Sequence, residues 1–383
     1  MTQDNKRNPF RVVALPVRRI SATGISEFKE CRRRWYYSNE SQLNLEPKRG
    51  TVAYDFGRKI HHALERHYRD GVHASDAFVE VFDSDVTRMV EVGMMGDDYS
   101  KYEAMRELGV QMLTYYENWA STHDDFKMLH TEFEFEIPLV DYDGTDLGVY
   151  FVGRIDGIVR TNDGLYYLIE YKTAGTHLAS DVMLLDEQTA RYQLAAQWLI
   201  RNGKVPGIPS DAILSGVIYT ALLKKIVKPP LLLKNGKGLS KDIVTNPTTY
   251  ELYLKAIQDN GFNESDYAAV LDKLQNTYPT GTIFVRREYV LRSKDEMQGH
   301  AHRLMLEVRE MSRENLPIYP SPKWDGSCAW SCPYHALCVT ENITGNLGGE
   351  VDFRIRNEFV QRPPRGGVYQ QPREGGYDGQ ELG

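Results

Sequence analysis

The stretch LGVYFVGRIDGIVRTNDGLYYLIEYKT, residues 147–173, decides the fold. Two runs rich in β-branched and aromatic residues flank Asn162-Asp163-Gly164, which is a strong signal for a tight turn. The stretch therefore predicts an antiparallel hairpin. Asp156 in the first strand and Glu170 in the second are nearly equidistant from the turn, so we expect their carboxylates to lie close together.

Lys172 follows Glu170 by two residues, so both side chains project from one face of the second strand, while Tyr171 points to the other face. Neighbouring carboxylates repel each other, and a divalent cation relieves that repulsion most simply. Phosphodiester hydrolysis needs such a cation and also a fixed positive charge for the transition state, which Lys172 can supply. The alternative is an ordinary ion pair on a solvated strand, which is the commoner meaning of an isolated match of this kind.

Three more residues favour a catalytic site near this hairpin. His61, in Gly57-x3-His61, lies on an expected helix from about Phe56 to Tyr68 and can offer an imidazole to the same metal. Gln188 and Tyr192 are four residues apart on an expected helix at 186–201, so they share a face that can reach the site or a nucleic-acid backbone.

The remaining sequence predicts an α/β fold with helical additions. Residues 75–122 are expected to be a helical insertion, and 224–240 a loop rich in Lys, Pro and Gly. We expect a basic N-terminal arm at 1–20 and a disordered tail at 345–383, which is rich in Gly, Pro, Gln and Arg. The other expected elements are helices at 21–37, 248–275 and 294–315, and strands at 131–140, 212–222 and 283–291.

Charge and hydropathy limit the classes of partner. The net charge of −7 argues against bulk electrostatic binding to nucleic acid, but residues 1–34 hold nine Lys/Arg against three acidic residues. Phosphate contacts can concentrate in this segment, although a solvated basic arm explains it equally well. No apolar run approaches the roughly 18 residues that span a bilayer, so we expect no membrane insertion and a cytoplasmic location.

The four cysteines are Cys31, Cys328, Cys332 and Cys338. A large chain without a signal segment is expected to keep its thiols reduced, so they are better interpreted as ligands than as disulfides. Four thiolates can hold either Zn²⁺ or a [4Fe–4S] cluster, although a zinc ribbon usually has two close CxxC pairs. Four buried structural thiols are the remaining alternative.

The ordered set G-x3-H, GRID, ExK and Q-x3-Y resembles the RecB-like branch of the PD-(D/E)xK nuclease superfamily over roughly residues 21–340, and IYTALLKK with LKNGKGLS resembles phage-encoded members. The resemblance implies a restriction-endonuclease-like core, in which a mixed central sheet is flanked by helices. Gln193 could replace Gln188 in the helix motif, but residue 197 would then be Gln where the family has Tyr, so Gln188 is preferred. The implied metal ligands are His61, Asp156, Glu170 and the Tyr171 carbonyl, with Lys172, Gln188 and Tyr192 as further catalytic residues.

One N-terminal cysteine and three C-terminal ones resemble the iron–sulfur nucleases of the AddB and CRISPR-associated exonuclease groups. This implies a [4Fe–4S] staple that joins Cys31 to the segment 328–338 within a nuclease domain spanning 21–344. The three-residue gap between Cys328 and Cys332 departs from the commoner two-residue gap, whereas the gap to Cys338 fits.

The implied activity is Mg²⁺- or Mn²⁺-dependent exonuclease action on DNA, from single-stranded ends, in phage DNA replication, recombination or repair. A helicase or recombination protein is the expected partner. The alternatives are a structure-specific endonuclease of the same fold and a non-catalytic iron–sulfur protein that binds DNA ends.

Overall fold

The structure is a computed structural model that divides the chain into two compact units. Met1–Val17, Ser26–Arg49 and Ser312–Gly383 form one, here called the terminal unit, while Arg18–Ile25 and Gly50–Met311 form the other, the sheet unit. The residues described are 17–47, 52–91, 97–141, 143–176, 179–276, 283–313, 316–323, 325–344 and 350–362.

The sheet unit is built on a six-stranded mixed sheet in the order β1-β4-β5-β6-β7, with β3 also paired to β4. The predicted hairpin is confirmed, because β4 and β5 pair antiparallel, whereas β5 and β6 run parallel. The strands are β1 (Arg19–Ile20), β3 (Phe126–Val140), β4 (Asp146–Thr161), β5 (Tyr166–Ala174), β6 (Leu214–Leu223) and β7 (Val285–Val290).

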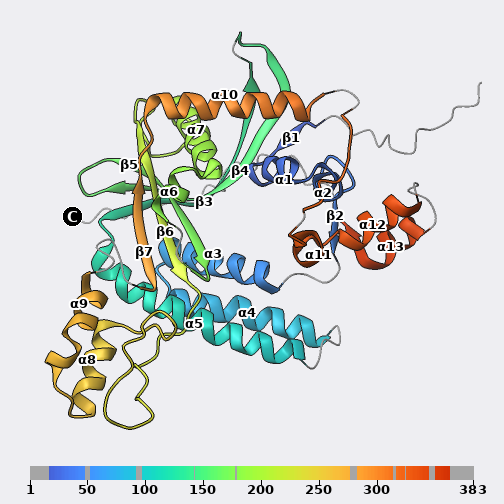
Figure 1. Cartoon of the computed structure of the whole chain (residues 1–383). Helices are drawn as coiled ribbons and strands as arrows, with labels where there is room; N and C mark the ends of the chain where they lie inside the picture. The colour runs from blue at the N-terminus through green and yellow to red at the C-terminus, as the bar shows by residue number, and fades with distance from the viewer. Residues whose placement is uncertain are drawn as a thin grey trace, which may run out of the picture. The chain divides into compact units, whose positions relative to one another are not determined.

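Helices cover both faces of this sheet, with α3, α4 and α5 on one side and α7 with α10 on the other (Figure 1). The predicted helical insertion at 75–122 corresponds to α4 and α5, but these helices complete the main core. Phe78 and Leu113 belong to the same buried cluster as Ile169 and Ile218 of the sheet. The helices are α3 (Val52–Asp70), α4 (Ala74–Glu91), α5 (Asp97–His123), α6 (Ser180–Leu184), α7 (Glu187–Arg201) and α10 (Lys294–Met311).

A small insertion with its own core, residues 224–276, lies between β6 and β7. The helical segment predicted at 248–275 consists of α8 (Tyr250–Asp259), the 3₁₀ turn η1 (Glu264–Tyr267) and α9 (Ala268–Asn276). Gly261, at φ +66°, follows the end of α8, and the Asn263 side chain caps η1.

Two sequence predictions near the start of the chain are corrected by the structure. The helix expected at 21–37 is broken at Cys31, whose extended backbone (φ −160°, ψ 112°) separates α1 (Ala22–Glu30) from α2 (Arg32–Ser38). The expected basic arm at 1–20 contributes strand β1 at its end, while residues 1–16 lie outside the described residues.

The tail predicted to be disordered is ordered over residues 350–362. It forms α13 (Glu350–Glu358) and β8 (Phe359–Gln361), and β8 pairs antiparallel with β2 (Leu45–Pro47). Val351 and Phe359 are buried in one cluster with Tyr334, so this part of the chain does find apolar partners. Residues 363–383 lie outside the described residues, and the unit is completed by α11 (Ser327–Ser331) and α12 (His335–Thr344). None of the helices in the described ranges is long and apolar enough to cross a bilayer.

Candidate active site

The β4–β5 hairpin brings two carboxylates to the same point of the sheet. Gly157 pairs with Ile169, and the next residues along that register are Asp156 and Glu170. The backbone N–H of Tyr171 donates a hydrogen bond to Asp156 Oδ2 at 2.8 Å, which fixes the Asp156 carboxylate beside β5. Glu170 is buried, with 3% of its surface exposed.

His61 reaches this point from α3. Its Nδ1 lies 3.3 Å from Asp156 Oδ1 and 3.7 Å from Glu132 Oε1. The imidazole is therefore in hydrogen-bond range of one predicted ligand and close to a second carboxylate that the sequence analysis did not single out.

Glu132 is this additional residue, and it lies on β3 opposite Asp156 in an unshifted register. Its φ of +46° is unusual for a residue with a side chain, and such strain is held where the surroundings over-determine the backbone. Arg154 Nε lies 2.7 Å from Glu132 Oε2. One ligand atom each from His61, Glu132 and Asp156 lies within 4.8 Å of the others, a spacing that could hold a metal ion.

Lys172 and Gln188 lie on the same side of the hairpin as Glu170. The Lys172 ammonium forms an ion pair with Glu170 and donates a hydrogen bond to Gln188 Oε1 at 3.4 Å. Asp186 accepts from the Gln188 N–H at 2.9 Å and so caps α7, which places Gln188 in the first turn of the helix.

Tyr192 lies one turn further along α7 and is buried against the ring of Phe135 at a centroid distance of 5.6 Å. Gln197, the residue that would replace Tyr192 if Gln193 were the motif glutamine, is used elsewhere. Its side chain donates to Ala212 O at 3.0 Å and accepts from Leu214 N at 2.9 Å, so it anchors the loop before β6. This arrangement favours Gln188.

The protonation of His61, Asp156 and Glu170 depends on the charges that these groups and Lys172 place next to one another. Burial disfavours a charged His61, but the charge and hydrogen bond of Asp156 outweigh it and raise the pKa of His61 to about 10. Burial and the charge of Asp156 together raise the pKa of Glu170 to about 7, against the opposing effect of Lys172. Burial would raise the pKa of Asp156, yet the His61 charge holds it below its ordinary value. The metal-free site therefore retains protons that a bound cation would displace.

The other face of β5 is fixed by a buried polar network. Tyr116, on α5, donates to the Tyr171 hydroxyl at 3.3 Å and shares a 2.6 Å hydrogen bond with Tyr68 of α3. Arg287 of β7 donates to Tyr116 at 3.3 Å and to Asp124 at 2.6 Å. Residues of α3, α5 and β7 are thus linked through Tyr116 to Tyr171, the residue between Glu170 and Lys172.

The four cysteines all belong to the terminal unit and are free thiols. Cys31 Sγ accepts a hydrogen bond from Ser321 N, and Cys328 Sγ accepts one from Lys323 N, each at 3.4 Å. Burial raises the pKa of Cys338 to about 11, against the opposing charge of Arg33 and with a smaller contribution from Cys31. Within the part of the chain that is described, the four thiols do not form a group with ligand atoms within 4.8 Å of one another.

Comparison with known proteins bears on this arrangement. The family model described as the PD-(D/E)XK nuclease superfamily matches residues 19–339. No curated protein matches. Among solved structures, "Crystal structure of SSO0001" is similar over 84% of this chain and 86% of that chain, at 12% identity and a TM-score of 0.32, which is too low to support an argument. The family match covers most of the chain and includes every residue of the hairpin site: the chain belongs to the PD-(D/E)XK nuclease superfamily, whose members are metal-dependent nucleases.

Proposed function

We propose that this protein is a DNA exonuclease that hydrolyses phosphodiester bonds from single-stranded ends with Mg²⁺ or Mn²⁺. The observation that carries the proposal is the convergence of His61, Asp156 and Glu170 beside the ammonium group of Lys172. A scaffold that only binds DNA ends has no use for buried carboxylates held next to each other.

The residues present fit a divalent cation. Oxygen donors from Asp156 and Glu170 suit Mg²⁺ and Mn²⁺, and the His61 imidazole adds a softer donor that Mn²⁺ accepts well. The Tyr171 carbonyl is the proposed fourth ligand, and Glu132 is a further candidate because its carboxylate lies in the same group as His61 and Asp156. A bound cation would polarise the scissile phosphate and lower the pKa of the attacking water.

Lys172 supplies the fixed positive charge. Burial disfavours its charged form, but the adjacent Glu170 more than compensates and raises the pKa of Lys172 above its usual range, so the amine stays protonated at every physiological pH. Gln188 accepts from the ammonium and so orients it, and the Tyr192 hydroxyl interacts with the Gln188 side chain. Lys172 is therefore placed to stabilise charge that develops on the phosphate.

The four cysteines are proposed to hold a [4Fe–4S] cluster. Backbone N–H groups already donate to two of the sulfur atoms, as hydrogen bonds to cluster thiolates do. Thiolates around one Zn²⁺, at Zn–S distances of about 2.3 Å, would lie about 3.8 Å apart, whereas a four-iron cluster needs wider spacing. The cluster would fasten Cys31 to α11 and α12 of the same unit.

The biological setting is proposed from the resemblance to phage-encoded RecB-like proteins. It would be DNA replication, recombination or repair in the cytoplasm of a bacterial host, with a helicase or recombination partner.

The test uses the full-length protein with end-labelled linear single-stranded DNA and circular single-stranded DNA, in Mg²⁺ or Mn²⁺. We expect the wild type to shorten linear DNA and leave circles intact, and Lys172→Ala to bind DNA without cleaving it. Lys127→Ala, a change of an exposed lysine on β3, is the matched control and should cleave normally. Cleaved circles would make the protein an endonuclease, and absence of cleavage with either metal would refute the proposal.

A further inference from the structure

A lysine-rich insertion leaves the sheet close to the candidate active site. Lys172 of β5 pairs with Ala221 of β6, and three residues later Lys224 N donates to Ala174 O at 2.7 Å. The insertion therefore begins at the carboxyl ends of β5 and β6, the same strand ends toward which Glu170 and Lys172 lie.

The first part of this insertion is a short hairpin, residues 231–240, here called the lysine–leucine hairpin. Leu232 and Leu239 form its bridge, and Leu233 N donates to Gly238 O at 2.8 Å. Gly236 adopts φ +68° at the tip and donates to Leu233 O at 2.8 Å.

Folded helices hold the hairpin in place. Leu239 N donates to the Tyr267 hydroxyl at 3.0 Å, and the Tyr253 hydroxyl donates to Ser240 O at 3.0 Å. Both tyrosines are buried in the insertion's own core. The hairpin is thus a supported projection with a defined conformation.

Its surface combines apolar and basic side chains. Leu231, Leu232 and Leu233 are 54%, 51% and 45% exposed. Consecutive exposed leucines are unfavourable in water and mark a contact surface. Residues 224–241 also contain six lysines and no acidic residue, with Lys234 and Lys237 exposed at the tip.

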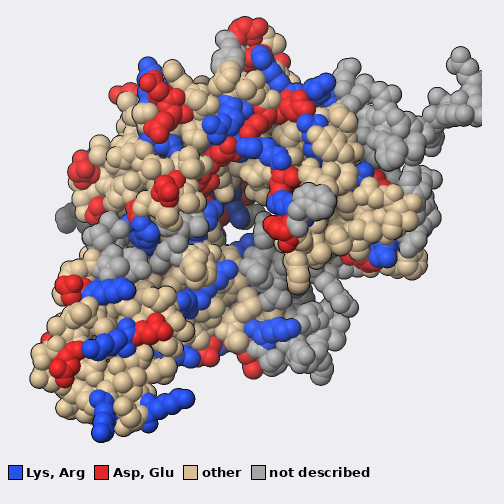
Figure 2. Space-filling model, in the orientation of Figure 1, with Lys and Arg blue, Asp and Glu red and all other residues tan. Residues whose placement is uncertain are grey.

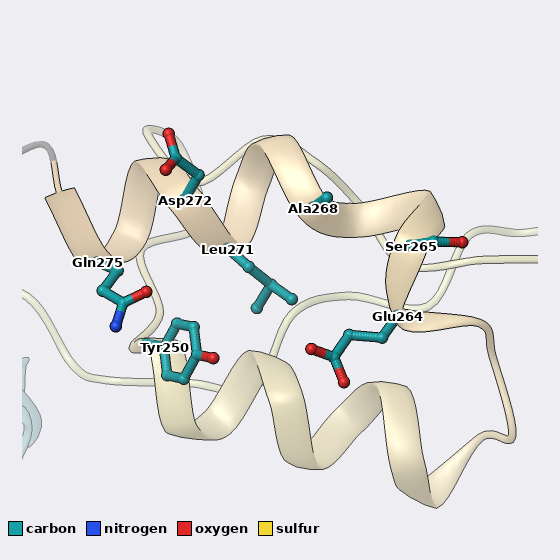
Figure 3. Close-up of a pocket in the computed structure, with 7 residues that line it drawn as sticks. All are labelled: Tyr250, Glu264, Ser265, Ala268, Leu271, Asp272 and Gln275. Atoms are coloured by element: carbon teal, nitrogen blue, oxygen red, sulfur yellow. The ribbon is translucent and has the colours of Figure 1, made fainter.

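The helices of the insertion differ in charge from the hairpin. A hollow between α8 and α9 is lined by Glu264 and Asp272, and the Glu264 carboxylate points toward α8 (Figure 3). Figure 2 shows both basic (blue) and acidic (red) side chains on this part of the molecule. Acidic side chains thus occur among the helices of the insertion, whereas residues 224–241 contain none.

We propose that the lysine–leucine hairpin is a DNA-contacting wedge that engages the junction where a single strand leaves a duplex. Lys234 and Lys237 bind phosphates as point charges, and the exposed leucines pack against the bases at the junction, as apolar wedges do when they enter base steps. DNA is favoured over a protein partner because the segment that carries the exposed leucines, residues 224–241, contains six lysines and no acidic residue. This inference rests on the proposed nuclease function and names the part of the substrate that the enzyme recognises.

The test measures binding of the full-length protein, in EDTA so that no cleavage occurs, to a forked duplex with 2-aminopurine at the junction. Lys234→Gln combined with Lys237→Gln should lower the slope of log affinity against log salt by about 1.4–1.8, since each phosphate contact contributes roughly 0.7–0.9. Leu231→Ser combined with Leu232→Ser should abolish the rise in 2-aminopurine fluorescence that reports unstacking. The matched controls are Lys273→Gln on α9 and Ile213→Ser before β6, both exposed, and these should behave as the wild type.

The outcomes separate this inference from the function on which it rests. If the wild type cleaves single-stranded DNA but the hairpin variants bind the fork as the controls do, the wedge is refuted and the nuclease stands; a surface for a protein partner would give this result. If the wild type neither binds nor cleaves DNA, both proposals fail. Melting temperatures of all variants should match the wild type, because every changed side chain is exposed.

Discussion

Raising the pH should tighten metal binding at the candidate site, because a cation must displace protons from its ligands. In the metal-free site the pKa of His61 is raised to about 10 and that of Glu170 to about 7. Below pH 7 both groups hold a proton that metal binding must release. Between pH 7 and 10 only His61 does so.

The number of protons released sets the size of the effect. Each released proton tightens apparent metal affinity about tenfold per pH unit. The half-saturating Mg²⁺ concentration should therefore fall nearly a hundredfold from pH 5.5 to 6.5, and about tenfold from pH 7.5 to 8.5. Metal affinity rises with pH because both pKa values are raised, and a ligand with a raised pKa holds its proton more strongly against the cation.

The assay is isothermal titration of the metal-free protein with Mg²⁺ in buffers of different ionisation enthalpy, which counts released protons directly. At pH 8, Mg²⁺ binding should release about one proton from the wild type and none from the His61→Asn variant. A half-saturating concentration that does not change between pH 7.5 and 9 in the wild type would refute the assignment of His61 as a ligand.

Three other changes test separate parts of the site. Gln188→Ala should lower kcat and leave DNA affinity unchanged, because the Lys172 ammonium loses the acceptor that orients it. A lower melting temperature that accompanies the loss of activity would indicate a structural role instead. Tyr116→Phe removes the central hydroxyl of the buried network and should cost about 1–3 kcal/mol of unfolding free energy, measured in urea, and raise the metal requirement; wild-type values for both would show that the network does not position β5. Cys31→Ser should abolish absorbance at about 400 nm in anaerobically purified protein and reduce bound iron, whereas stoichiometric zinc without iron in the wild type would reject the cluster.

The sequence predicts the hairpin well because its signals are local. The turn at Asn162-Asp163-Gly164 and the alternation on either side define both strands, and counting from the turn places Asp156 level with Glu170. The position of Gln188 follows in the same way from helical spacing. These features depend on residues that are close in sequence, so the regular geometry of a strand or helix is sufficient to predict them.

Glu132 could not be identified by this route. It is one of three glutamates in TEFEFE, and alternation alone gives each the same weight. Its distinction is the left-handed backbone and its place opposite Asp156, and both depend on pairing with a strand about twenty residues away. The order of residues 350–362 was missed for the same reason, because Val351 and Phe359 are buried by residues more than ten positions distant in the sequence.

The helices α4 and α5 show why their interpretation as an insertion was incomplete. An added helical hairpin could be removed without disturbing the site, but Tyr116 of α5 hydrogen-bonds to Tyr171, the residue between the proposed ligand Glu170 and the proposed catalytic Lys172. Because side chains alternate along a strand, the face of β5 that carries the chemistry cannot shift without moving the face that α5 holds. Helix α5, which the sequence predicted to belong to an insertion, thus fixes the proposed metal site from the opposite face of β5 through Tyr171.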